Sequence, residues 1–223
     1  LAASNAPSLA RAFLTLHRAY RDNQERLASL DEALGHGAST LGASPWEEVR
    51  DFFHYCDNYI DAVDRAAEGI AQQLGPNFEA GTAELLKRQN VNIVYRDMPD
   101  IRLYDIETHT LYLSTRTSLA TRRFQLAHQI GLLLQDPLIE ATLDFARFKS
   151  PAARDIAKIG LANYFAGALV MPYVKFLTAA QETRHDLERL SDRFGASIEQ
   201  VCHRLSMLQR GGEKGIPFYF LRI

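Results

Sequence analysis

Arg122–Leu134, RRFQLAHQIGLLL, carries the strongest signal in this chain. In the H-E-x-x-H helix of zinc hydrolases, two histidines four residues apart share one face and bind the metal, and the glutamate is the general base. His128 occupies the position of the first histidine. Gln129 stands in place of the glutamate and Leu132 in place of the second histidine. Because an amide cannot accept the proton and an alkyl chain cannot bind zinc, the helix keeps the pattern of the motif without its chemistry.

Two segments resemble the zinc-dependent peptidases that are related to phage-repressor-cleaving regulators. Residues 123–131, RFQLAHQIG, resemble their R-F-T-L-A-H-E-L-G-H helix, and residues 162–172, ANYFAGALVMP, resemble their E-x-x-A-N-x-F-A-x-x-L-L-M-P segment. In active members a carboxylate just before the Ala-Asn pair is the third metal ligand, but here that region holds Ile159, Gly160 and Leu161. A catalytic zinc site needs three protein ligands and a water molecule. We therefore expect a degenerate zincin-like domain with no metal and no enzymatic activity.

Composition narrows the class of protein. The chain has 223 residues, 47% of them hydrophobic and 23% charged, as is usual for a globular protein. A formal net charge of −2 leaves no overall positive field to attract nucleic acid or acidic membranes. Two cysteines, Cys56 and Cys202, provide no disulfide framework, which favours a cytoplasmic location. No apolar run approaches the roughly 18 residues of a membrane span, so no membrane partner is expected. Because the chain begins at Leu1, we expect a fragment of a longer protein.

Hydrophobic periodicity predicts a mostly helical α+β fold. We expect helices over residues 8–30, 46–74, 78–89, 118–134, 138–148 and 152–170. Strand patterns at 91–95, 101–105 and 110–114, the last two joined by a turn at 107–109, predict a small antiparallel sheet. A last strand is expected over 216–223. These elements suggest three parts: a helical region at 1–89 that could dimerise, a degenerate zincin-like ligand-binding domain at 90–175, and a helix-turn-helix-like unit with a terminal strand at 176–223.

The helix-turn-helix spacing lies in residues 190–205, LSDRFGASIEQVCHRL. Gly195 is suited to the turn, Ser197 to the cap of the second helix, and Val201 and Leu205 to its buried face. One interpretation is that Glu199, Gln200, His203 and Arg204 enter a major groove of DNA. Against it, a glutamate would face phosphates and no dense stripe of Lys and Arg surrounds the motif. The alternative is that this unit only closes the zincin-like domain.

Together, these three motifs resemble the short-chain fatty-acyl transcriptional regulators of propionate and acetate metabolism, the family of the methylcitrate-cycle regulator PrpR and its relative RamB. The resemblance covers most of the chain. It implies a ligand-sensing domain that binds a short-chain acyl-CoA, similar to propionyl-CoA, and reports it to an amino-terminal DNA-binding domain absent from this chain. A homodimer or higher homo-oligomer is the implied assembly. Such regulators also have a cysteine-rich carboxy-terminal part, but two cysteines cannot supply a four-cysteine iron–sulfur cluster.

An acyl-CoA needs two kinds of contact. Its phosphates are bound by Arg, Lys and helix N-termini, and its adenine stacks on aromatic or guanidinium planes. Its acyl and pantetheine arm needs an apolar tunnel with a few polar groups. We therefore expect the ligand-binding residues to be Tyr95, Arg102, Tyr104, Arg122, Arg123, Phe124, His128, Tyr164, Phe165 and Lys175. Because Gln129 and Leu132 replace the glutamate and histidine of the zincin motif, they remove buried charge. We therefore expect an apolar pocket between the sheet and the two helices that carry the motifs of residues 123–131 and 162–172.

Two alternatives belong to other functional classes. A residual zincin-like metallopeptidase would use His128 and ligands that these motifs do not reveal, and it would lose activity on chelation. A purely structural module would dimerise through residues 9–30 and 46–74. Apolar side chains would then tightly fill the cleft where a zincin has its active site.

Overall fold

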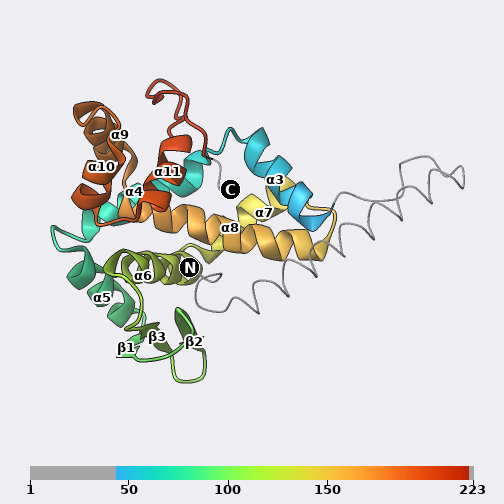
Figure 1. Ribbon diagram of the computed structural model, residues 1–223. Coiled ribbons are helices and arrows are strands. Elements are labelled where there is room, and N and C mark those ends of the chain that lie inside the picture. Colours follow the sequence, from blue (N-terminus) through green and yellow to red (C-terminus); the bar gives the residue numbers. More distant parts are fainter. Residues whose placement is uncertain (1–43, 221–223) are drawn as a thin grey trace, which may run out of the picture. The chain divides into compact units, whose positions relative to one another are not determined.

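The fold is built around helix α8 (Pro151–Val170), which runs through the middle of the molecule (Figure 1). The computed structural model describes residues 44–220. Ser150 caps α8 by accepting a hydrogen bond from the Ala153 N–H, and Pro151 begins it. Helix α6 (Leu119–Leu134) packs along α8 at close range, because a Cβ at Gly131 would lie 2.8 Å from the Phe165 ring. The helices that carry the two motifs, α6 and α8, therefore form the core together.

Seven further helices surround this pair in the described part of the chain. They are α3 (Pro45–Tyr55), α4 (Asp61–Gln73), α5 (Phe78–Arg88), α7 (Asp136–Ala146), α9 (Tyr173–Glu182), α10 (Leu187–Phe194) and α11 (Ile198–Ser206). The prediction of one helix over 46–74 is wrong, because the segment divides into α3 and α4. Asp57 and Asn58 adopt φ angles of 51° and 56° at the break. Asp and Asn tolerate this left-handed conformation better than most residues, and it cannot continue a helix.

The sheet contains three strands, β1 (Asn92–Arg96), β2 (Arg102–Asp105) and β3 (Thr110–Ser114), in the order β1-β3-β2. The predicted hairpin of β2 and β3 is confirmed, but β1 pairs with β3 in parallel, so the sheet is mixed and not antiparallel throughout. Strand β3 takes the centre because Leu111 and Leu113 are both fully buried. Arg102 lies opposite Leu113, so its side chain shares the inner face of the sheet.

The carboxy-terminal helices α10 and α11 meet at a tight turn. Gly195 has a φ of 58°, and Ser197 forms a capping box with Gln200 at the start of α11. The strand predicted over 216–223 is not found in its described part, residues 216–220, which has no regular structure. Residues 221–223 lie outside the described residues.

From Pro45 on, the chain packs as one compact unit. The boundaries predicted near residues 89 and 175 both fall inside this unit, the second of them within α9, and the division into three parts stays a prediction. The predicted helix 8–30 lies outside the described residues. No helix of residues 44–220 is both long and apolar enough to cross a membrane.

Candidate functional site

The degenerate centre, which comprises Arg102, His128, Gln129 and Asn163, occupies the place of a zincin active site. His128 is buried on α6, and its Nδ1 lies 2.9 Å from Oδ1 of Asn163 on α8. Since an amide oxygen only accepts hydrogen bonds, Nδ1 carries the proton and Nε2 is left as an acceptor. Burial and the nearby Arg102 charge lower the pKa of His128 to about 4, against the opposing effect of the Asn163 hydrogen bond. The imidazole is therefore neutral at physiological pH.

A guanidinium group stands beside this neutral histidine. Arg102 reaches from strand β2 to α6, where it donates a hydrogen bond of 2.7 Å to Oε1 of Gln129. Burial lowers the pKa of Arg102. Within residues 44–220, Arg102 has no ion pair with any carboxylate, so no described residue compensates the positive charge of the degenerate centre.

The zincin scaffold implies a zinc ion, but the residues present do not fit one. Gln129 and Leu132 offer no replacement for the lost glutamate and histidine. On α8, where the third ligand would lie, Ile159, Gly160 and Leu161 have no carboxylate to replace it. Ile159 is 58% exposed, Gly160 packs against Phe53 and Leu161 is fully buried. In the described ranges, no three His, Cys, Asp or Glu side chains are grouped to hold a metal. The adjacent Arg102 cation would also repel one.

A cavity of about 560 Å³ adjoins this centre. It lies among helices α3, α6, α8 and α11, and Asn163 belongs both to its wall and to the degenerate centre. The other lining residues are Phe53, Asn58, Thr121, Phe124, Gly160, Tyr164, Gly167, Ser197, Glu199, Gln200, His203, Arg204 and Met207. No sheet residue contributes, so this cavity does not lie between the helices and the sheet, where a pocket was predicted.

Four of the ten predicted ligand residues lie at these two neighbouring places. Phe124 and Tyr164 line the cavity, whereas Arg102 and His128 belong to the degenerate centre. Phe165 faces the core and is fully buried against Gly131.

The other predicted residues have different surroundings. Arg122 donates to the carbonyl oxygen of Thr117 at 2.7 Å. Arg123 pairs with Glu79 and donates to the carbonyl of Phe194 at 3.2 Å, so it holds α6 to α5 and α10. Tyr104 lies on β2 with its hydroxyl 3.3 Å from Nδ1 of His109. Tyr95 and Lys175 are exposed, and neither lines the cavity.

The sequence-based reasoning missed the contribution of α11 to the cavity. Ser197, Gln200, His203 and Met207 line it, although two of these residues were considered for DNA contact. The available signal was Asp64, an acidic residue on the same buried face of α4 as Val63 and Ala67. An acid in such a position requires a partner, and that partner is Arg204.

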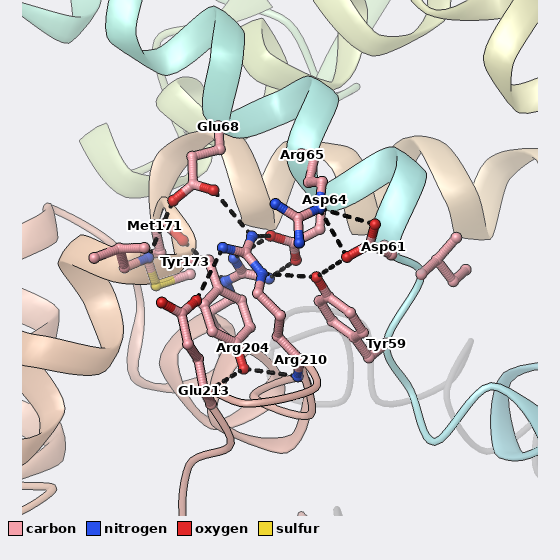
Figure 2. Close-up of polar contacts among 12 residues, drawn as sticks. Tyr59, Asp61, Asp64, Arg65, Glu68, Met171, Tyr173, Arg204, Arg210 and Glu213 are labelled. Atoms are coloured by element: carbon pink, nitrogen blue, oxygen red, sulfur yellow. Dashed lines mark hydrogen bonds and ion pairs between the residues drawn. The ribbon is translucent and has the colours of Figure 1, made fainter.

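The interpretation in which Arg204 enters a DNA groove, against which the surrounding charge already counted, does not hold. Its side chain is fully buried, with Nη1 2.6 Å from Oδ2 of Asp64 and Nε donating to the carbonyl of Met171 at 2.9 Å (Figure 2). Burial disfavours the charged form of Arg204, but the Asp64 carboxylate more than offsets this effect and raises the pKa of the guanidinium. The apparent recognition helix therefore uses its arginine to attach α11 to α4.

A second arginine completes this buried ion network, which comprises Asp64, Glu68, Arg204 and Arg210 (Figure 2). Arg210 contacts Glu68 at 2.9 Å and Asp64 at 3.3 Å, and its guanidinium lies 4.0 Å from the ring centroid of Tyr173. The network therefore joins α4, α9, α11 and the segment that follows α11. It also touches the cavity, because Arg204 and Tyr164, whose hydroxyl donates to Asp64 at 2.9 Å, both line the cavity wall.

The fold and the degenerate centre define the class: a zincin-like domain whose metal-ligand set has been lost. Residues 86–206 match the model of the IrrE N-terminal-like domain, also called peptidase M78, and the chain belongs to this family.

The curated relatives are transcriptional regulators. A propionyl-CoA carboxylase regulator of Cereibacter sphaeroides is 63% identical over the whole of this chain, which spans 48% of that protein. The HTH-type transcriptional regulators RamB and PrpR of Mycobacterium tuberculosis are 39% and 38% identical over 97% of the chain, which spans 48% and 46% of them. A solved structure of a Mycobacterium tuberculosis transcriptional regulator superposes with a TM-score of 0.75 at 41% identity, over 78% of this chain and 55% of that one.

The expected kinship with regulators of the PrpR and RamB type is thereby confirmed. The chain spans about half the length of the curated relatives it matches.

Proposed function

We propose that this chain is the ligand-sensing part of a transcription factor that controls genes of propionate and acetate metabolism, and that its cavity binds a short-chain acyl-CoA. The observation that carries the proposal is a cavity of about 560 Å³ in a homologue of a propionyl-CoA carboxylase regulator. Pockets for small ligands commonly measure about 300–1,000 Å³. The size therefore suits an acyl-pantetheine arm, with the nucleotide outside.

The lining of the cavity supports this ligand. Phe53, Phe124 and Met207 provide apolar wall for the acyl chain and the pantetheine methylenes. Asn163 and Gln200 provide amides that can hydrogen-bond to the thioester carbonyl and the pantetheine amides. An apolar tunnel with a few polar groups is the usual form of such a site.

The N-termini of α6 and α11 at the cavity favour binding of the phosphate groups of coenzyme A. Thr121 lies in the first turn of α6 and Ser197 is the N-cap of α11, and both line the cavity. Helix N-termini attract anions through their free N–H groups and their dipoles. Arg122, beside Thr121, is half-buried and adds a positive charge near the α6 start. Glu199 on the α11 side opposes an anion, so we expect the phosphates near α6.

In this proposal the domain is a pseudo-peptidase, since the degenerate centre lacks both the base and the metal ligands. DNA would be read by a part of the protein outside this chain, in the cytoplasm, and a homo-oligomer would transmit the signal. Ligand binding changes DNA binding only if the ligand has different affinities for two arrangements of the protein.

A cavity-filling substitution tests the proposal. A Cβ at Gly167 would meet nothing within 4 Å, and Gly167 lines the cavity, so the side chain of Gly167→Leu would begin in open space and extend into the ligand space. The helix itself should tolerate the change, because leucine is favoured over glycine in a helix interior by up to about 1 kcal/mol. We expect propionyl-CoA binding, measured by calorimetry and native mass spectrometry, to weaken at least about tenfold.

Gly69→Leu is the matched control. Gly69 lies inside α4, also has nothing within 4 Å of a Cβ, and does not line the cavity. Its substitution should leave binding unchanged. If folded Gly167→Leu binds propionyl-CoA as the wild type does, or if the wild type binds none, the acyl-CoA proposal is wrong.

A further inference from the structure

We propose that Arg102, together with the side-chain amide of Gln129, binds the carboxylate group of a small organic ligand at the degenerate centre. This site is separate from the larger cavity, although Asn163 adjoins both. A fixed guanidinium would thus provide positive charge at a centre where a zincin would use a metal ion.

The described arginines differ in how their charge is compensated. Arg204 and Arg210, the most buried arginines of the described residues, face Asp64 and Glu68, and the half-buried Arg123 faces Glu79. Arg102, also half-buried, has only the neutral Gln129 as a partner among residues 44–220. Burying a charge without an opposite charge is costly. An anion bound at Arg102 would remove that cost.

The direction of the Arg102 side chain and its remaining donors also suit a carboxylate. Arg102 lies on the inner face of the sheet, opposite Leu113, and its half-buried side chain points toward α6. A guanidinium has five N–H donors, and one hydrogen bond to Gln129 leaves most of them free. Carboxylates are bound by such a planar fork through two parallel hydrogen bonds. Because Oε1 of Gln129 accepts from Arg102, its NH₂ group remains a further donor.

The side chains around Arg102 determine which kind of carboxylate fits. His128 is neutral and adds no charge, and Leu132, four residues later on α6, shares its helix face. A carboxylate with a short apolar body suits one cation beside an alkyl side chain. The carboxylate could be that of a free short-chain acid, or the far end of an acyl chain that enters from the cavity past Asn163. Only the second source rests on the proposed function.

The first experiment uses the full 223-residue chain and sodium propionate. We expect the Arg102 Nε–H and Gln129 side-chain NH₂ resonances to shift and saturate with propionate but not with sodium chloride at equal ionic strength. Arg102→Gln should weaken the saturable binding at least about tenfold, since hydrogen bonds to charged groups are the strong ones. Arg96→Gln is the control. Arg96 lies on the outer face of the same sheet, 4.7 Å over the Tyr112 ring.

The second arm compares succinyl-CoA with butyryl-CoA, which differ in a terminal carboxylate. Tighter binding of succinyl-CoA in the wild type, lost in Arg102→Gln, would assign the carboxylate to an acyl chain. Saturable shifts with propionate alone would assign it to a free acid, even if no CoA ester binds. The proposal is overturned if propionate gives no saturable shift and the two esters bind equally or not at all, or if Arg102→Gln changes neither preference. The wild-type measurements decide the question even if that variant does not fold.

Discussion

Two regions of this domain bury arginines, and they do so in opposite ways. In the buried ion network, Arg204 and Arg210 share the carboxylates of Asp64 and Glu68. In the degenerate centre, Arg102 faces an amide and a neutral histidine. A compensated cation is complete within the chain and holds helices together, whereas an uncompensated one gains most from an external anion. The comparison therefore separates a structural network from a candidate binding site.

The two regions also differ in what they touch. The ion network ties α4 to α11 and to the segment after it, and Arg204 and Tyr164 form part of the cavity wall. The degenerate centre reaches the same cavity from α6 and β2 through Asn163. A ligand in the cavity would thus contact elements that both regions hold in place.

The largest expected effect comes from removing the shared carboxylate of the ion network. Asp64→Asn keeps the shape of the side chain but leaves Arg204 and Arg210 buried without their common charge. Breaking a buried ion pair by removing one partner typically costs about 3–5 kcal/mol. We expect a loss of that size in the free energy of unfolding, measured by urea denaturation.

Glu84→Gln is the exposed counterpart. It removes a surface pair with Arg88, 3.2 Å apart and one helical turn away, whose contribution should be below about 1 kcal/mol. Equal losses for Asp64→Asn and Glu84→Gln would contradict the distinct role of the buried network.

The next effect concerns the degenerate centre and pH. His128 has a pKa of about 4 in the folded protein and an ordinary value of 6.5. Between these values the unfolded state binds the proton and the folded state does not, so stability falls as the pH is lowered from 6.5 to 4. The loss should approach about 3 kcal/mol, since one pKa unit corresponds to about 1.36 kcal/mol.

Unfolding free energies of wild type and His128→Gln, compared across this pH range, isolate the effect, because other titrating groups contribute to both. The wild type should lose more stability than the variant. Parallel curves would show that His128 is not held neutral by its surroundings.

The smallest effect sharpens the contrast between the two arginine sites. Arg102→Gln removes one hydrogen bond to Gln129 but also an uncompensated charge, and the two consequences oppose each other. We expect the free energy of unfolding to change by less than about 1 kcal/mol in urea denaturation. Arg204→Gln, which leaves Asp64 buried without its nearest cation, should cost several times more. A large loss for Arg102→Gln would make that residue structural as well.

Local patterns were sufficient for much of the fold. The two motif helices, the β2–β3 hairpin and the Gly195 turn with its Ser197 cap all occur as predicted, because each depends on periodicity and turn chemistry within a few residues. The break between α3 and α4 was missed because Asp57 and Asn58 leave the helical conformation without a glycine or proline to signal it.

The features that were not predicted depend on contacts between residues that are distant along the chain. Strand alternation specifies a strand but not its neighbour, so β1 was not expected to pair in parallel with β3. Likewise, a surface arginine and a buried one look the same in a helical repeat, and only the packing of α11 on α4 makes Arg204 a partner of Asp64. The sequence alone shows that Gln129 and Leu132 stand where a zincin has its base and second histidine, since ligand chemistry belongs to residue identity. The cavity, the buried ion network and the lack of a carboxylate partner for Arg102 among residues 44–220 depend on which side chains meet, and only the tertiary structure determines that.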